Sequence, residues 1–452
     1  MTHFFINCYF FRFSVSQFEK KCVYLHPQTH TEPASQGAGA VARGEHYILN
    51  CVAHSALFTT MGYGEDHGSR TCRSQIPPLF LCSRRNINLT SLILGLWQTN
   101  TNVYMGTLRL FFALSVLLGH VGVIGGIDPM HAVQGFYVIS GFYMSLILNE
   151  KYCTPDSNIL FYKKRFLRLA PTYWLLAMIC LILSIIYYMQ GTTNVLLFDF
   201  KNFPTNASLA TYAYLIVSNI IIWGQDLALF LSISPDTGDM MWTASTYAEQ
   251  HPMIRYMLMP VSWSVSLEFT FYIIAPYILR NKTKWVHVLF IISLLSNVVT
   301  HYFNLNDANW RFRFFPSTLV FFLTGYYAYR LYSLLENHQY NKKYGCLAVL
   351  SVIVISLVFL NLNFPYIFRA SFLLVETLLF IPYVFYSTKA NRVDRYIGEL
   401  SYPLYLIHPI FIGINELAGF GNNCFVIVGS LLGSILCYQL FIVRLERYRS
   451  GL

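Results

Sequence analysis

From Met105 onward the chain is a nearly continuous series of long apolar runs, and this pattern restricts its fold more than any other feature. Most runs are about 20 residues long, the length of helix that crosses the hydrocarbon core of a bilayer. The runs predicted to span the membrane are 106–125, 131–149, 170–189, 258–279, 285–303, 314–332, 345–361, 366–387, 402–419 and 424–443. A further apolar segment, 208–233, contains Asn219, Gln225 and Asp226, which suit a lipid-facing helix poorly. We predict an all-α integral membrane protein, a bundle of about ten transmembrane helices with one re-entrant or interfacial segment.

The composition argues against an ordinary soluble protein. Charged residues make up only 12% of the chain, about half their usual share in soluble domains. The net charge of +10 would suggest a nucleic-acid partner in a soluble protein. Here the Lys and Arg residues gather between the apolar runs, as topology requires, so the bilayer and not nucleic acid is the expected partner. The ten Cys residues form no Cys-x-x-Cys pair and no zinc-like spacing, so no metal site is predicted.

The distribution of positive charge predicts the orientation. If Met105 starts on the cytoplasmic side and 208–233 does not cross, seventeen Lys and Arg residues lie in cytoplasmic loops and five lie outside. This is the bias expected of a membrane protein. A single crossing by 208–233 would invert every later loop and remove the bias. We therefore expect both ends of 105–452 to be cytoplasmic, in the cytoplasmic (inner) membrane of a bacterium.

Residues 1–104 lack the pattern of the rest. They hold half of the ten Cys residues and a Gly-Ala-Gly-Ala stretch at 37–40, and they show neither a helical nor a strand period. Their apolar opening is interrupted by Asn7, Arg12 and Ser14 and makes a poor signal peptide. We expect 1–104 to be a poorly ordered extension, or upstream translation from a start codon that the cell does not use. Residues 105–452 are expected to form the membrane domain.

Arg109 and His120 are ionisable residues within the first apolar run. Eleven helical residues turn through about 1100°, so the two side chains lie within roughly 20° of one face and about 16 Å apart along the axis. Such a pair could bind a long anionic ligand by its head and place His120 at the other end. The alternative is an Arg that reaches the lipid headgroups and a His that bonds a neighbouring helix.

Two further stretches place polar groups at or within predicted spans. Arg165 and Arg168 are three residues apart just before Pro171, where their guanidinium groups could bind phosphate or simply mark the cytoplasmic side. Glu268 lies inside an apolar run, six residues into Trp263-Ser-Val-Ser-Leu-Glu-Phe-Thr-Phe-Tyr272. This carboxyl group is either functional or part of a hydrogen bond between helices.

A last polar stretch reads Ser401-Tyr402-Pro-Leu-Tyr405-Leu-Ile-His408-Pro409. Its two Tyr residues and His408 are three residues apart and so spread around a helix. His408 could also bond a backbone carbonyl that Pro409 leaves free. Asp128 lies in a short outer loop, where it is expected to be solvated.

These stretches, in this order, resemble the integral-membrane acyltransferase family 3 over residues 106–443. The resemblance rests on Arg-x10-His from Arg109 and on Gln-Gly-Phe-Tyr-Val-Ile-Ser-Gly-Phe at 134–142. It also rests on Arg-x-x-Arg before Pro171-Thr-Tyr-Trp, on Trp-Ser-x3-Glu-x3-Tyr from Trp263, and on Ser-Tyr-x2-Tyr-Leu-x-His-Pro from Ser401. Gly106 departs from the family pattern, which commonly has Asp there. Members of this family O-acylate surface sugars, polysaccharides, peptidoglycan or small molecules, usually with acetyl-CoA as donor.

The resemblance and the residues together predict roles for ten side chains. His120 is the expected general base, and Glu268 is the second catalytic candidate, which could orient the imidazole or the acceptor. The predicted donor-binding residues are Arg109, Arg165 and Arg168, and the supporting residues are Ser140, Trp263, Tyr402, Tyr405 and His408. We expect acyl-CoA as co-substrate, a carbohydrate or lipid-linked glycan as acceptor, and no bound cofactor. A covalent acyl-His intermediate is an open alternative.

Two other classes of protein remain alternatives. A transporter or flippase would often show two similar halves, and no repeat is visible. A lipid-linked glycosyltransferase would use an acid in the first outer loop, where Asp128 stands, but it would leave the Arg109/His120 and Arg165/Arg168 pairs without a role.

Overall fold

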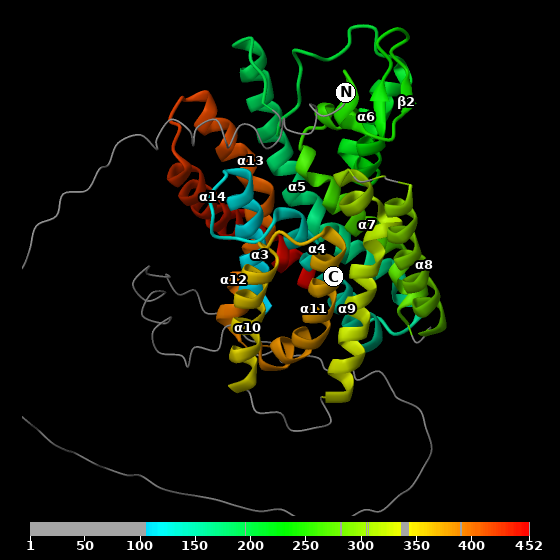
Figure 1. Ribbon diagram of the computed structural model, residues 1–452. Coiled ribbons are helices and arrows are strands. Elements are labelled where there is room, and N and C mark those ends of the chain that lie inside the picture. The colour runs from blue at the N-terminus through cyan, green and yellow to red at the C-terminus, as the bar shows by residue number, and fades with distance from the viewer. Residues whose placement is uncertain are drawn as a thin grey trace, which may run out of the picture. The chain divides into compact units, whose positions relative to one another are not determined.

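The computed structural model describes residues 105–451, except 195, 281–282, 304, 306, 336–342 and 389–390. The expectation for residues 1–104 lies outside this part of the chain. The described residues form a helical bundle (Figure 1).

A helix lies in each of the ten predicted ranges. These helices are α3 (Met105–His120), α4 (Pro129–Glu150), α5 (Asn158–Met189), α7 (Trp263–Ile278), α8 (Thr283–Tyr302), α9 (Phe315–Leu335), α10 (Lys343–Phe359), α11 (Tyr366–Thr388), α13 (Ser401–Leu417) and α14 (Asn423–Cys437). Some of them, such as α3, α7 and α14, leave five or more residues of the predicted range uncovered. The shorter helices are α6 (Leu209–Ile221), α12 (Arg392–Glu399) and α15 (Val443–Ser450). Short 3-10 turns lie at Pro155–Ser157, Gln225–Phe230, Thr246–Ala248, Met253–Tyr256 and Pro260–Ser262, and π-helical turns at Asn309–Arg313 and Tyr438–Ile442.

Six helical stretches among the described residues are long and apolar enough to cross a membrane. They are Pro129–Glu150, Pro155–Met189, Thr283–Tyr302, Tyr366–Ser387, Arg392–Leu417 and Asn423–Arg449. Helices α3 and α7 have 16 residues each, which gives about 24 Å of helix against a hydrocarbon core of about 30 Å. The predicted count of ten spans is therefore not confirmed.

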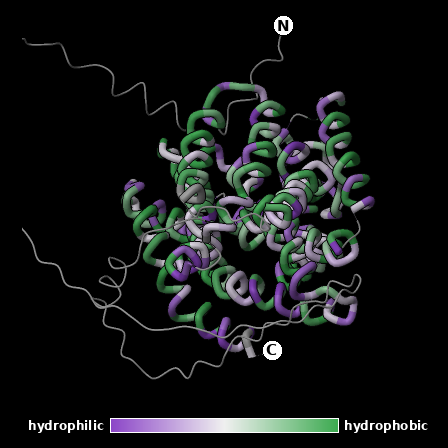
Figure 2. The backbone as a smooth tube through the Cα atoms, turned by 90° about the horizontal axis from the view of Figure 1, so that it is seen from below, coloured by the Kyte–Doolittle hydropathy of each residue, from purple (hydrophilic) through white to green (hydrophobic). Residues whose placement is uncertain are grey.

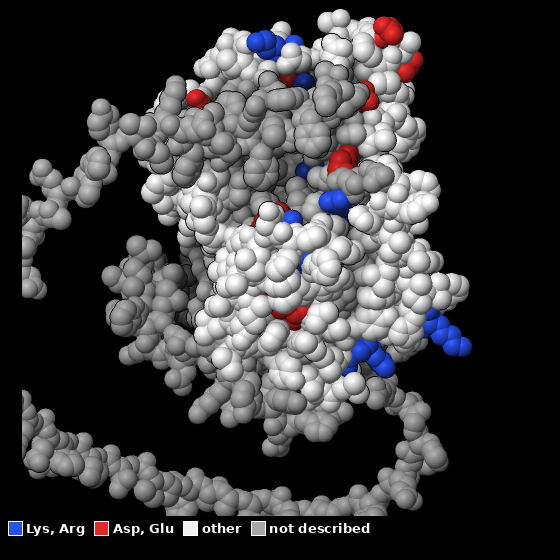
Figure 3. Space-filling model, viewed as in Figure 1, with Lys and Arg blue, Asp and Glu red and all other residues white. Residues whose placement is uncertain are grey.

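The outer faces of several helices are apolar. Along α8, Val288, Ile292, Leu295 and Val299 recur at helical spacing and are all exposed, Leu295 to 55%. Soluble monomers rarely expose large contiguous apolar patches, whereas a bilayer favours them. Hydrophobic residues run along most of the helices in Figure 2, and charged side chains are few on the face drawn in Figure 3. The described unit is an integral membrane domain.

Helix α4 forms the centre of the bundle, because α3, α7, α9 and α11 all pack against it. Its approach to α9 depends on two glycines. A Cβ atom at Gly141 would lie 1.8 Å from the carbonyl oxygen of Phe322, and one at Gly325 would lie 2.2 Å from that of Val138. Small residues allow such close backbone contacts between membrane helices. This packing holds Ser140, the neighbour of Gly141, inside the bundle.

The segment 208–233 is not one continuous helix. Helix α6 ends at Ile221, and the next residues, Ile222 and Gly224, have positive φ angles of 69° and 90°. A 3-10 turn then leads into strand β1 (Leu231–Ile233), which pairs antiparallel with β2 (Met240–Trp242). The domain is therefore predominantly helical, and the all-α prediction omitted this small hairpin.

We predict that the segment 208–233 does not cross the membrane. Its helix α6 has 13 residues, about 20 Å of helix, which is too short for the hydrocarbon core. In a chain whose native cysteines, among them the exposed Cys424, are replaced by Ser, single cysteines introduced at Lys201 and Arg255, which flank the segment, should both react with a membrane-impermeant thiol reagent added outside intact cells. A cysteine at Lys163 is the control and should react only after the cells are opened. Labelling of positions 201 and 255 from opposite sides would contradict the predicted topology.

Candidate active site

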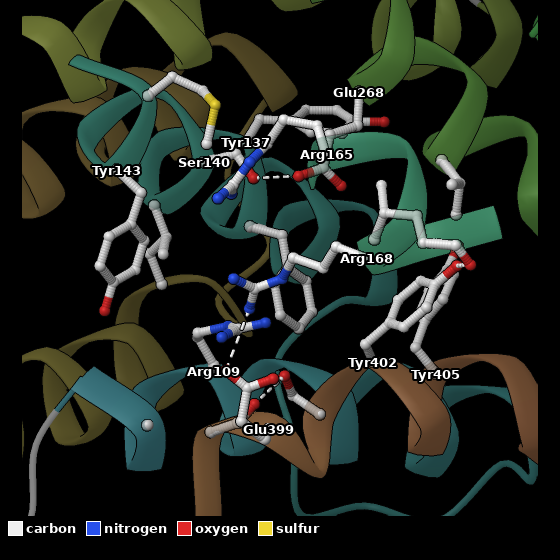
Figure 4. A pocket seen from close by; sticks show the side chains of 18 of the residues that line it. Arg109, Tyr137, Ser140, Tyr143, Arg165, Arg168, Glu268, Glu399, Tyr402 and Tyr405 are labelled. Carbon is white, nitrogen blue, oxygen red and sulfur yellow. Dashed lines mark hydrogen bonds and ion pairs between the residues drawn. The ribbon is translucent and has the colours of Figure 1, made fainter. Parts of the chain in front are cut away.

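A cavity of about 370 Å³ lies between helices α3, α4, α5, α7, α11, α12 and α13 (Figure 4). Seven of the residues predicted from the sequence line it, namely Arg109, Ser140, Arg165, Arg168, Glu268, Tyr402 and Tyr405. The other three predicted residues, His120, Trp263 and His408, are not among the lining residues. The cavity therefore joins side chains from five of the predicted stretches.

Arginines gather along one part of this cavity. Helix α5 starts at Asn158 and continues through Pro171, so Arg165 and Arg168 lie inside a helix that begins well before the predicted span 170–189. The Nη2 atom of Arg168 lies 3.3 Å from Oε1 of Glu399. The Nε atom of Arg165 is buried with no hydrogen-bond partner among the described residues.

Arg109 lies beside the Arg168–Glu399 pair, as Figure 4 shows, and interacts electrostatically with Glu399. Neither Arg109 nor Arg165 forms an ion pair with an acid in the described part of the chain. The guanidinium groups of Arg109 and Arg165 thus border the cavity without an ion pair to a described carboxylate, and so does that of Arg395. This arrangement suits an anionic ligand, because guanidinium groups bind phosphate in a bidentate manner.

Close packing of α3 on α12 holds Arg109 in this position. The carboxylate of Asp394 accepts hydrogen bonds from the backbone N–H groups of Gly106 (2.7 Å) and Thr107 (3.0 Å). A Cβ atom at Gly106 would lie 1.7 Å from the carbonyl oxygen of Asp394. Position 106, where the family resemblance would place an acid, thus receives a carboxylate from α12 instead.

Glu268 lies on the face of α7 that borders the cavity. Ser264, Glu268 and Tyr272 are four residues apart and share this face. The Oε1 atom of Glu268 accepts a hydrogen bond from Ser140 Oγ on α4 (2.5 Å) and another from the Tyr272 hydroxyl. Glu268 therefore forms the interhelical hydrogen bond that the sequence left open as an alternative.

His120 is the last residue of α3, and its side chain is exposed. Its Nδ1 atom lies 2.9 Å from the carbonyl oxygen of Val116. A carbonyl oxygen can only accept, so Nδ1 carries the proton and Nε2 of the neutral ring has a free lone pair. The imidazole is therefore positioned by its own helix, and Glu268 forms no hydrogen bond to it.

His120 packs against His408 of α13, with ring centroids 4.9 Å apart. Arg109 meets α12 and His120 meets α13, so both side chains of α3 face the α12–α13 unit, as their spacing predicted. His408 is buried, and neither ring nitrogen has a hydrogen-bond partner of ordinary geometry among the described residues. Tyr405 borders the cavity and lies 6.0 Å from His408, centroid to centroid. Tyr405 and His408 thus connect the cavity with His120.

The remaining predicted residues hold neighbouring elements together. The Tyr402 hydroxyl donates to the carbonyl oxygen of Leu169 on α5 (2.9 Å), and the Tyr405 hydroxyl bonds to the carbonyl of Val261 (2.8 Å). The Trp263 ring lies under the guanidinium group of Arg313, 5.0 Å from centroid to Cζ. The contacts of Tyr402, Tyr405 and Trp263 thus fix elements that surround the cavity and His120.

A family model described as an acyltransferase domain matches residues 102–440. The chain belongs to this acyltransferase family. The resemblance seen in the sequence is therefore confirmed, and the described unit is a membrane acyltransferase. Searches of curated proteins and of solved structures find no match.

Several cavity residues of this acyltransferase were not predicted from its sequence. Glu399 and Asp394 precede the Ser401–Pro409 stretch, but their partners Arg168 and Gly106 are 231 and 288 residues away in the chain. Tyr272 could have been found, because it lies one helical turn from Glu268.

Neither the loop that contains Asp128 nor a cluster of metal-binding side chains provides an alternative site among the described residues. Asp128 caps α4 through the backbone N–H of Met130 (2.8 Å) and lies 3.8 Å from Arg369, which is a structural role. No group of three or more His, Cys, Asp and Glu side chains in this part of the chain is placed to hold a metal ion.

A second, larger cavity of about 730 Å³ lies on the opposite side of α7. Its lining is mostly apolar and includes Trp223, Phe230, Trp310 and Phe314. Thr270 faces this cavity, whereas Glu268 faces the first one, so α7 forms a wall between the two.

Proposed function

We propose that this acyltransferase moves an acyl group, usually acetyl, from acyl-CoA to a hydroxyl group of a cell-surface or exported carbohydrate. The observation that carries the proposal is the arrangement along α3. Arg109, with no acid partner among the described residues, borders the cavity near one end of the helix. His120, with a free Nε2 atom, stands at the other end about 16 Å away.

The donor enters the cavity from the cytoplasmic side in this proposal. Its phosphates bind Arg165 and Arg109, two cavity-lining guanidinium groups that form no ion pair with an acid in the described part of the chain. Arg168 contributes positive charge but shares it with Glu399. The pantetheine arm then follows the cavity between α3, α4 and α13 and brings the thioester toward Tyr405 and the two His residues.

His120 acts as the general base. Its Nε2 atom takes the proton of the acceptor hydroxyl while the hydroxyl oxygen attacks the thioester carbonyl carbon. The C–S bond then breaks, and the CoA thiolate leaves and takes up that proton from the imidazolium. The products are the acyl ester and free CoA. Glu268 and Ser140 have a supporting role, because Glu268 fixes α7 against α4 beside the cavity.

The function can be tested on the cell-surface glycans of a deletion strain. We expect mass spectrometry to show glycans that have lost the mass of an acyl group, and the wild-type gene should restore it. The His120→Ala gene should not restore the acyl group although its protein reaches the membrane. Identical glycan masses in the deletion and wild-type strains would contradict a carbohydrate acceptor.

A further inference from the structure

The π-helical turn Asn309–Arg313 precedes α9 and carries an Arg residue that none of the steps above uses. Turns of this kind are rare and occur often at functional sites. Arg313 lies over the Trp263 ring, and its Nη1 atom donates to Oδ1 of Asn309 (3.0 Å). Its Nε atom is buried and has no hydrogen-bond partner among the described residues. It forms no ion pair with an acid in that part of the chain.

Arg313 contacts Trp263 of α7 and acts electrostatically on groups of the proposed reaction centre. It interacts electrostatically with His120, with Tyr405 at the edge of the first cavity, and with Tyr137. The Tyr137 hydroxyl is also buried without a hydrogen-bond partner in the described residues. A partly buried cation without an anionic partner is costly in a membrane protein. A ligand that brings its own anionic group would remove this cost.

Asn309 and its hydrogen bonds hold the guanidinium group of Arg313 in a fixed orientation. Asn309, which accepts from Nη1, donates through Nδ2 to the carbonyl oxygen of Leu229 (2.8 Å) and to Oγ1 of Thr246 (2.9 Å). The ring of Trp263 lies on another side of the guanidinium group, 5.0 Å from Cζ to the ring centroid. The edge formed by Nε and Nη2 is left without a partner among the described residues, and this edge matches a carboxylate or phosphate in two parallel hydrogen bonds.

We propose that Arg313 binds an anionic group, a carboxylate or a phosphate, of the acceptor beside His120. The inference deepens the proposed function and rests on it. It assigns the acceptor to the class of acidic sugars or sugar phosphates. Arg109 and Arg165 then bind the anionic end of the donor, and Arg313 binds that of the acceptor on the other side of the thioester.

The test measures binding of small sugars to the purified protein in detergent by titration calorimetry. The probes are methyl glucoside as the neutral sugar, methyl glucuronide as the carboxylate and glucose 6-phosphate as the phosphate. We expect the wild-type protein to bind one of the anionic sugars at least about tenfold more tightly than methyl glucoside, the usual gain from a charge-assisted hydrogen bond. Arg313→Gln should abolish this preference, and Arg313→Lys should keep only part of it because Lys cannot form the paired contact.

Arg311→Gln is the matched control. Arg311 lies in the same π-helical turn, but its guanidinium group lies over Tyr366 (5.6 Å), so its loss should leave the preference intact. Equal or absent binding of neutral and anionic sugars by the wild type would overturn the proposal. A preference for anionic sugars that persists in Arg313→Gln would also overturn it. If Arg313→Gln does not stay monodisperse, a preference that keeps its full strength in Arg313→Lys would overturn it instead.

The binding test is independent of the proposed chemistry. It needs neither acyl-CoA nor turnover, so the charge preference would persist even if His120 were not the base. Conversely, His120→Ala could prove inactive while the wild-type protein shows no preference for anionic sugars. These results would support the proposed acyl transfer and refute the anion site.

Discussion

His120→Ala will lower acyl transfer by about 10²–10⁴-fold, the usual contribution of a positioned general base, while acyl-CoA binding stays nearly unchanged. The structure separates these effects, because His120 lies outside the cavity that the donor is proposed to occupy. Its free Nε2 atom is needed only when the acceptor hydroxyl loses its proton. The measurement is activity per mole of monodisperse, detergent-extracted protein, with donor binding determined separately.

His287→Ala is a suitable control for this experiment. His287 bonds to Tyr327 on the exposed side of α8 and α9, away from the cavity, so its loss should leave activity unchanged. If His120 served only folding, His120→Ala would lower the yield of inserted protein and leave the activity per folded molecule intact. A His120→Ala protein with near wild-type activity would end the proposed mechanism.

Arg165→Ala and Arg168→Ala will differ in their effect on stability. Both should weaken acyl-CoA binding, and each should change turnover at saturation less than affinity, because phosphate contacts act mainly in binding. Arg168→Ala should also destabilise the protein by about 1–3 kcal/mol, since the partly buried Glu399 carboxylate loses its ion pair. Arg165→Ala should not have this cost, because Arg165 has no ion pair with a described acid.

Thermal unfolding of the purified variants, with and without acyl-CoA, measures both effects. The double variant Arg168→Ala/Glu399→Gln should recover most of the lost stability, because no unpaired charge remains, but it should not recover donor affinity. Arg165→Lys should rescue donor binding only in part, because an ammonium group cannot form the bidentate contact. Equal destabilisation by Arg165→Ala and Arg168→Ala would refute the distinct roles of the two arginines.

The sequence itself determined the features that depend on local regularities. The long apolar runs predicted a helix at each of the ten positions, because about 20 consecutive apolar residues have few alternatives to a membrane helix. The helical period predicted that Arg109 and His120 share a face, and both do face the α12–α13 unit. The order of five short motifs identified the acyltransferase family.

Only the tertiary structure decided which polar groups meet. Arg168 pairs with Glu399, Ser140 with Glu268, and Asp394 with the start of α3, and each contact joins helices that are more than a hundred residues apart in the chain. Hydropathy and helical period say which face of a helix is polar but not which helix lies opposite, since that depends on backbone packing such as that at Gly106 and Gly141. The break after α6 and the β1–β2 hairpin were not predicted for the same reason. The hydropathy of an apolar run is the same whether the run continues as a helix or turns at Ile222 and packs on its neighbours.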